Sequence, residues 1–207
     1  MKNNLLFITL LIALAIGALF AKENTEAEIK DGDIIFQTSK SMQSNPIQLA
    51  TKSKYSHCGI IYKKGSDFYV YEAVGPVKLT SMKEWIARGK NNTYVVKRLK
   101  NVEKIITPDV LKKMKQVGDQ FKGKPYDITF EWDDNRIYCS ELVWKIYKQA
   151  AGIEIGKLQK FKEFDFTDTR VKQIIKDRFH NKIPREEIVI SPAAIFDSEL
   201  LITVQSK

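Results

Sequence analysis

The chain has 207 residues, of which 43% are hydrophobic and 29% are charged, and its formal net charge at pH 7 is +9. This composition excludes a disordered chain and a collagen-like repeat, and the length suffices for a compact core. The basic residues are spread along the whole chain, without a recognition-helix or zinc-finger pattern. We therefore expect no nucleic-acid partner, and instead contact with an anionic surface of the cell envelope.

Residues 5–21 predict a secretory signal peptide. They contain 15 apolar residues out of 17 and no charge, and they lie between Lys2 and a charged stretch. A basic start, an apolar centre and a small residue such as Ala21 before a polar run are typical of such signals. We expect cleavage after Ala21, export to the periplasm or beyond, and a mature charge of +8 once Lys2 is lost. An uncleaved membrane anchor is the alternative, although a spanning helix needs about 20 apolar residues.

Residues 22–207 predict one α+β domain, because neither a repeat nor a flexible linker interrupts them. The hydrophobic patterns and turn residues predict strands at 33–36, 56–62, 67–73, 93–99 and 188–190, and helices at 45–52, 81–86, 107–121, 139–152 and from 191. Residues 155–182 are charged and only partly helical. Their pattern assigns them no role, although such a segment could cover a groove.

The two β-rich runs on either side of Gly65 predict a hairpin that brings a histidine to a carboxylate. A loop at Lys64-Gly65 places His57 directly opposite Glu72, with Cβ atoms roughly 5 Å apart on one face. A carboxylate there holds one imidazole nitrogen and leaves the other free, which is the orienting half of a catalytic triad. A loop at Gly65-Ser66 would pair His57 with Val74 instead.

The two cysteines lie in different settings. Strand alternation turns Cys58 away from His57, as a small buried apolar side chain, which argues against a disulfide with Cys139. Cys139 begins a helix, where free backbone N–H groups favour a thiolate and an acyl oxyanion. Each residue alone is also compatible with simple packing. The second histidine, His180, lies in a charged segment, and no cluster of metal ligands accompanies it, so we expect neither a metal nor another cofactor.

Five sequence blocks together resemble the permuted papain-like amidases of the YiiX/YaeF type, distant relatives of the NlpC-type cell-wall peptidases. The blocks are DGDIIF, ATKSKYSHCGII, YEAVGPV, GKPYD and YCSELVWKIY, within residues 31–152. The resemblance implies a circularly permuted papain-like fold, with an antiparallel sheet packed against helices. It implies Cys139 as the nucleophile, His57 as the base and Glu72 as the group that orients the imidazole.

The resemblance also makes Tyr126 a candidate for substrate or oxyanion contact, although a core aromatic residue would give the same pattern. Gln37 is a further candidate for a polar lining residue. The Cys block has Tyr138 and Glu141 where the cell-wall enzymes have a D-C-S-G form, so the substrate stays open. We expect an exported cysteine hydrolase that cleaves an amide in a wall peptide, an N-acyl amino acid or a lipid. The alternatives are an acyltransferase of the same fold and a non-catalytic module that binds wall fragments or lipid.

Overall fold

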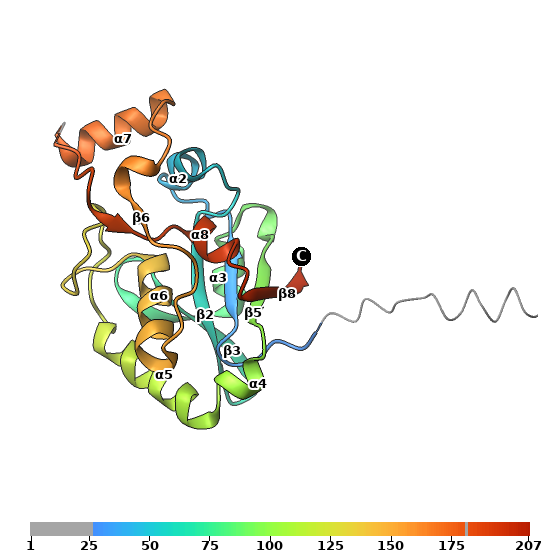
Figure 1. Ribbon diagram of the computed structural model, residues 1–207. Coiled ribbons are helices and arrows are strands. Elements are labelled where there is room, and N and C mark those ends of the chain that lie inside the picture. Colours follow the sequence, from blue (N-terminus) through green and yellow to red (C-terminus); the bar gives the residue numbers. More distant parts are fainter. Residues whose placement is uncertain (1–26, 181) are drawn as a thin grey trace, which may run out of the picture.

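The computed structural model describes residues 27–180 and 182–207 (Figure 1). The predicted signal peptide lies outside these residues. In chain order the strands are β1 (Ile34–Gln37), β2 (His57–Lys64), β3 (Asp67–Ala73), β4 (Val77–Ser81), β5 (Val95–Leu99), β6 (Gln159–Lys160), β7 (Ile188–Val189) and β8 (Leu201–Ser206). The α-helices are α2 (Ser44–Thr51), α3 (Met82–Ala87), α4 (Val102–Ile105), α5 (Pro108–Phe121), α6 (Cys139–Ala151), α7 (Thr169–Phe179) and α8 (Pro192–Phe196). Within this part of the chain, no helix is long and apolar enough to cross a membrane.

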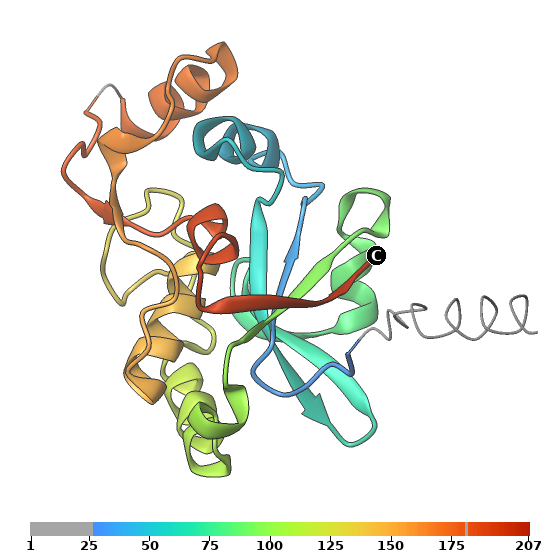
Figure 2. The ribbon, with the colours of Figure 1, turned by 45° about the vertical axis from the view of Figure 1, so that its right-hand side comes forward.

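A six-stranded antiparallel sheet in the order β4-β3-β2-β1-β5-β8 forms the centre of the fold. Helices α5 and α6 cover one face, and α3 lies on the other, as Figure 2 shows. The larger core lies between the sheet and α6. It includes Ile60 of the sheet and Leu142 and Ile146 of the helix, all fully buried. The mixed α and β content and the antiparallel sheet confirm the predicted fold class.

Strand β2 is buried on both faces over its first six residues. Cys58 and Ile60 belong to the core on the α6 side, whereas Ile61 belongs to the core on the α3 side. This double burial explains why the segment is almost continuously apolar in sequence rather than alternating. It also places His57, the first residue of β2, at the end of a rigid central strand.

The two edge strands of the sheet, β4 and β8, were missing from the elements predicted from sequence. Each strand has a weak pattern of alternating hydrophobicity. In β4 the neighbours Lys78 and Leu79 are both exposed, and in β8 the neighbours Ile202 and Thr203 are both exposed. An edge strand has a ladder partner on one side only, so its pairing with the neighbouring strand, rather than its own sequence, decides its conformation.

The segment whose role the sequence left open forms a separate layer above one end of the sheet. Helix α7 packs against α2 there, and β6 pairs with β7 (Figures 1 and 2). Asp168 caps the start of α7 by accepting a hydrogen bond from the backbone N–H of Arg170 at 2.9 Å. The apolar residues of this helix, including Ile174, then face α2 across a cavity.

Candidate active site

The hairpin has a different register from the predicted one, although it still joins the histidine to the carboxylate. Its two-residue loop is Gly65-Ser66, and Lys64 pairs with Asp67. Gly65 has φ +66°, a conformation that glycine adopts without strain, and this residue therefore sets the loop. The prediction that His57 lies directly opposite Glu72 was wrong by two residues: Gly59 takes that position, and His57 lies two residues before it on β2.

Glu72 reaches His57 diagonally across Gly59. The distance from His57 Nε2 to Glu72 Oε2 is 2.6 Å, and both side chains are buried. A Cβ atom on Gly59 would lie 2.5 Å from Cγ1 of Val70 and 2.8 Å from the carbonyl oxygen of Tyr71, so strand β3 packs closely here only because this residue is a glycine. The contact expected from sequence is therefore present, but it runs diagonally between the strands and does not join directly opposed residues.

The Glu72 carboxylate is held by three groups. Besides His57, Thr80 Oγ1 donates a hydrogen bond to Oε1 at 2.6 Å, and Arg88 Nη2 contacts the same oxygen. Burial alone would raise the pKa of Glu72, but these bonds and charges lower it. The carboxylate therefore stays ionised and orients the imidazole.

Trp85 of α3 covers the histidine. Its ring stacks on that of His57 with centroids 5.8 Å apart and an interplanar angle of 24°, and its side chain is fully buried. This packing limits rotation of the imidazole and shields its bond to Glu72 from water. Sequence reasoning missed Trp85, Thr80 and Arg88. Trp85 was visible only as an apolar position of a short helix, and nothing in the sequence pattern joined the other two to Glu72.

Cys139 is the first residue of α6 and is almost fully buried, with 2% of its surface exposed. A hydrogen bond from the Cys58 thiol, attraction to His57 and the backbone N–H of Cys58 lower the pKa of Cys139 well below its usual value, against the effect of burial. Burial would lower the pKa of His57, but the Cys139 thiolate and Glu72 raise it to about 9. The geometry thus favours a thiolate beside an imidazolium.

Cys58 is buried and free, as expected from the sequence, but it lies beside Cys139. Cys58 does face the opposite side of the strand from Ile61, as alternation requires, but that side is packed against the first turn of α6. The two cysteines are both free and buried, and they are hydrogen-bonded to each other. Burial and the neighbouring Cys139 raise the pKa of Cys58, so it remains a thiol that can donate.

Two polar residues named from sequence lie near this centre. Tyr126 forms an isolated bridge with Ile137, just before α6. Burial and the charge of Cys139 raise the pKa of Tyr126, so its hydroxyl keeps its proton. Gln37 pairs with His57 in the β1–β2 ladder and is 1% exposed. Its side-chain amide has no hydrogen-bond partner in the described part of the chain.

A cavity of about 710 Å³, including its open mouth, extends from Cys139 to α7. Its walls come mainly from α2, α7, the segment that carries Phe161, Phe164 and Phe166, and the stretch from Ile190 to Pro192. The lining is largely aromatic and aliphatic. The charged segment 155–182 therefore has a role that the sequence did not reveal, because its apolar residues line the space in front of the cysteine.

Comparisons with known proteins identify the family of the chain. A model of the permuted papain-like amidases, the YaeF/YiiX or C92 family, matches residues 28–205. The chain belongs to this family. A curated relative, the uncharacterized protein YiiX of Escherichia coli strain K12, is 45% identical over 204 residues, which cover 99% of this chain and 96% of YiiX.

A solved structure of the same family extends the comparison to the fold. A crystal structure described as the metalloprotein YiiX from Escherichia coli O157:H7 has a TM-score of 0.81 and 48% identity to this chain. The match covers 86% of this chain and 97% of that one. The description as a metalloprotein applies to that relative. Among residues 27–180 and 182–207 of the present chain, no group of three or more His, Cys, Asp or Glu side chains is arranged to hold a metal ion.

Proposed function

We propose that the chain is a cysteine amidase in which Cys139, His57 and Glu72 act as nucleophile, acid–base and orienting carboxylate. The observation that carries the proposal is the contact of His57 with both Cys139 and Glu72 inside a buried centre. A thiolate of lowered pKa beside an imidazolium is an activated nucleophile. Membership in an amidase family supports the same type of reaction.

The reaction proceeds through an acyl-enzyme. The Cys139 thiolate attacks the amide carbonyl carbon, and the backbone N–H of Cys139 and the Tyr126 hydroxyl stabilise the oxyanion. The C–N bond breaks as the His57 imidazolium gives its proton to the leaving amine. The neutral imidazole then takes a proton from water, which attacks the thioester and releases the carboxylic acid. The C–S bond breaks with Cys139 leaving as the thiolate, and His57 keeps the proton taken from water, so the thiolate–imidazolium pair is restored.

The cavity supports an apolar acyl group on the substrate. Phe161, Phe164, Ile174 and Ile175 line it, and Cys139 lies at one part of its wall. Burial of an alkyl chain contributes about 0.8 kcal/mol per CH₂ group. A polar wall peptide would gain little from this lining. A lipid amide or an N-acyl amino acid is therefore favoured over a wall stem peptide.

An activated acyl probe tests the proposal directly. We expect the chain from Lys22 onward to gain the mass of a dodecanoyl group when it reacts with a dodecanoyl thioester, as read by intact mass spectrometry. Cys139→Ala abolishes the adduct, and His57→Ala slows its formation. An adduct that survives in Cys139→Ala, or labels Cys58 instead, would rule out the assignment. Stable binding without any adduct would indicate the non-catalytic module, and capture of the acyl group by an added amine would indicate an acyltransferase.

We also propose that the mature chain works in the cell envelope. The support is the signal-like segment at residues 5–21 and the mature charge of +8. Mass spectrometry of the protein from a periplasmic or secreted fraction should give a chain that begins at Lys22. A full-length chain held in the membrane fraction would favour the anchor instead.

A further inference from the structure

The cavity wall contains a positive charge that the proposed chemistry does not use. Apart from the Cys139 thiolate, Arg178 is the only charged residue among the described residues that line the cavity. It follows Val171, Ile174 and Ile175 on the same face of α7, in the spacing of one helix side. The charge therefore lies at the end of an apolar helix face that is about 10 Å long.

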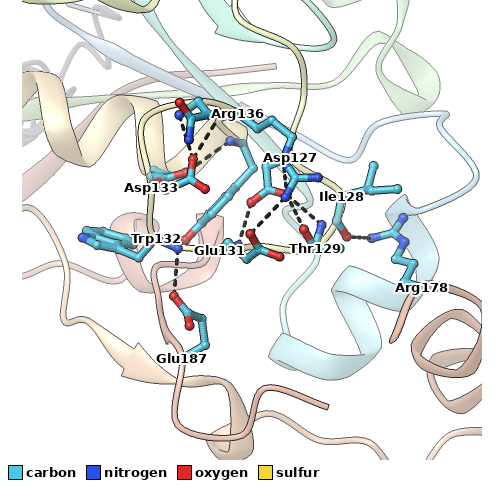
Figure 3. Close-up of polar contacts among 12 residues, drawn as sticks. Asp127, Ile128, Thr129, Glu131, Trp132, Asp133, Arg136, Arg178 and Glu187 are labelled. Carbon is cyan, nitrogen blue, oxygen red and sulfur yellow. Dashed lines mark hydrogen bonds and ion pairs between the residues drawn. The ribbon is translucent and has the colours of Figure 1, made fainter. Parts of the chain in front are cut away.

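The guanidinium of Arg178 is half-buried, and its protein partners are neutral. Nη1 donates to the carbonyl oxygen of Ile128 at 3.1 Å (Figure 3), and Nη2 donates to Oε1 of Gln43 at 2.9 Å. The group also lies over the ring of Phe130, 5.6 Å from its centroid. A guanidinium has five N–H donors. No carboxylate forms an ion pair with Arg178 in the part of the chain that the structure describes.

Asp127 attracts Arg178 electrostatically but is committed to its own loop. Its carboxylate accepts hydrogen bonds from the backbone and hydroxyl of Thr129 and from the backbone of Glu131, and Arg136 lies 3.8 Å away (Figure 3). Partial burial of a cation takes away part of its hydration, and an anion beside the cation offsets that cost. The unpaired charge of Arg178 is therefore suited to an anion that arrives with the ligand.

Polar groups connect Arg178 to the reactive centre. Gln43 accepts a hydrogen bond from Arg178 and is itself hydrogen-bonded to the side chain of Tyr126. Tyr126 in turn lies close enough to Cys139 that the thiolate raises its pKa. One end of the cavity is thus polar and cationic, and the other is lined by phenylalanine and isoleucine.

We propose that Arg178 binds an oxyanion on the amine part of the substrate, so that the preferred substrate is an acyl amide with a carboxylate or phosphate close to the scissile bond. This inference rests on the proposed amidase function and names its substrate class. Arg178 pairs with the anion through its free N–H donors, and the acyl chain occupies the apolar part of the cavity.

Matched substrates test the charge directly. N-dodecanoylglycine and N-dodecanoylglycinamide differ only in the carboxylate, and N-dodecanoyl-phosphoethanolamine represents the phosphate source. We expect the wild-type chain to have a kcat/KM about 10- to 100-fold higher for whichever anionic substrate it uses than for the glycinamide. Arg178→Gln should remove this preference, because kcat/KM falls more for the anionic substrate than for the glycinamide, whereas Arg178→Lys should keep part of it. Arg170→Gln, an equal change of charge on the exposed face of the same helix, should alter neither rate.

Three outcomes would overturn the inference. These are equal kcat/KM values for charged and neutral substrates in the wild type, equal losses on both in Arg178→Gln, and the same loss in Arg170→Gln. A purely structural role of Arg178 would give the second outcome. If Arg178→Gln does not fold, the wild-type preference and Arg178→Lys decide the question.

A binding experiment separates this inference from the amidase proposal. In full-length Cys139→Ala, calorimetry should give a dissociation constant about 10-fold lower or more for N-dodecanoylglycine than for its glycinamide. The double variant with Arg178→Gln should lose that difference. Anion-selective binding without turnover in the wild type would refute the amidase function and retain the anion site. Turnover without anion selectivity would do the reverse.

Discussion

At the residue scale, the candidate site depends on how one histidine is shared. His57 contacts Glu72 through Nε2, which leaves Nδ1 for Cys139, and Trp85 holds the ring in place. The Cys58 thiol supplies a further hydrogen bond to Cys139. Each of these contacts stabilises the charged form of its partner, so their removal should be visible in titration as well as in rate.

Glu72→Gln keeps the size of the side chain and removes its charge. We expect the pKa of His57 to fall by about 1 to 3 units, because an opposite charge no longer stabilises the imidazolium. We expect kcat/KM to fall about 100-fold, since acid–base catalysis is impaired. Titration of the His57 ring by NMR and steady-state kinetics measure the two effects. Glu84→Gln, an exposed carboxylate on α3, is the matched control and should change neither.

Cys58→Ala removes the thiol donor to Cys139. We expect the pKa of Cys139 to rise by about 1 unit, because a hydrogen bond to a charged group contributes about 1.5 kcal/mol or more. The rate of alkylation by iodoacetamide as a function of pH measures this value. Cys58→Ser retains an O–H donor and should restore much of the shift. An unchanged profile in Cys58→Ala would mean that the neighbouring thiol is only a packing group.

The pH dependence of kcat/KM follows from the directions of the two shifts. The pKa of Cys139 is lowered and that of His57 is raised to about 9, so the thiolate–imidazolium pair exists between them. We expect activity to rise with pH as Cys139 ionises and to fall as pH passes about 9, where His57 loses the proton that the leaving amine needs. A rate that stays constant well above this pH would contradict His57 as the acid.

At the element scale, α7 forms one wall of the apolar cavity. The residues that α7 contributes to the lining lie on one face, whereas Lys172 on the same helix is exposed. The helix is held over the site by its contacts with α2 and by the bonds of Arg178. Changes on its inner face should therefore alter substrate preference more than stability.

Ile174→Trp should shorten the cavity. Each methylene that is kept out of it costs about 0.8 kcal/mol, or about a fourfold loss in kcat/KM. We expect a large loss for a dodecanoyl substrate and a small one for a butanoyl substrate, measured as a series of chain lengths. Lys172→Trp adds the same ring outside the cavity and should leave the series unchanged. Equal losses at every chain length would place the acyl group elsewhere.

At the scale of the whole molecule, a buried ion pair joins the beginning of the described chain to the middle of the sheet. Arg98 Nε and Nη2 donate to the two carboxylate oxygens of Asp33, each at 2.7 Å, and both residues are buried. Arg98 also donates to the carbonyl oxygen of Glu28 at 2.5 Å. The proposed reaction uses neither residue of this pair, so we expect the pair to affect folding alone.

Asp33→Asn should lower the free energy of unfolding by about 3 to 5 kcal/mol, because it leaves the Arg98 charge buried and unpaired. Chemical denaturation measures the change, and the residual activity of the folded fraction should match the wild type. Glu103→Gln, which breaks the exposed pair with Lys30, is the control and should lower the free energy of unfolding far less, because solvent screens that pair. Similar values for the two variants would mean that burial does not strengthen the Asp33 pair.

The sequence by itself determined the fold class, most of the helices and central strands, and the family. These features depend on local signals such as apolar periodicity, Pro108 at a helix start, and the blocks around His57 and Cys139. It also identified the residues that now form the candidate centre. The hairpin register was predicted wrongly, because loops at Lys64-Gly65 and at Gly65-Ser66 fit the same sequence pattern. In the folded chain Gly65, with its positive φ, is the first residue of the loop, and this position sets the register.

Only the tertiary structure decided which distant groups surround these residues. Arg88 and Thr80 meet Glu72, and Cys58 meets Cys139, because three strands, the end of α3 and the first turn of α6 converge there. The edge strands and the cavity beneath α7 also depend on pairing and packing across the fold. The sequence specified the reactive groups, whereas their protonation and the space in front of them come from contacts between residues far apart in the chain, which no local pattern records.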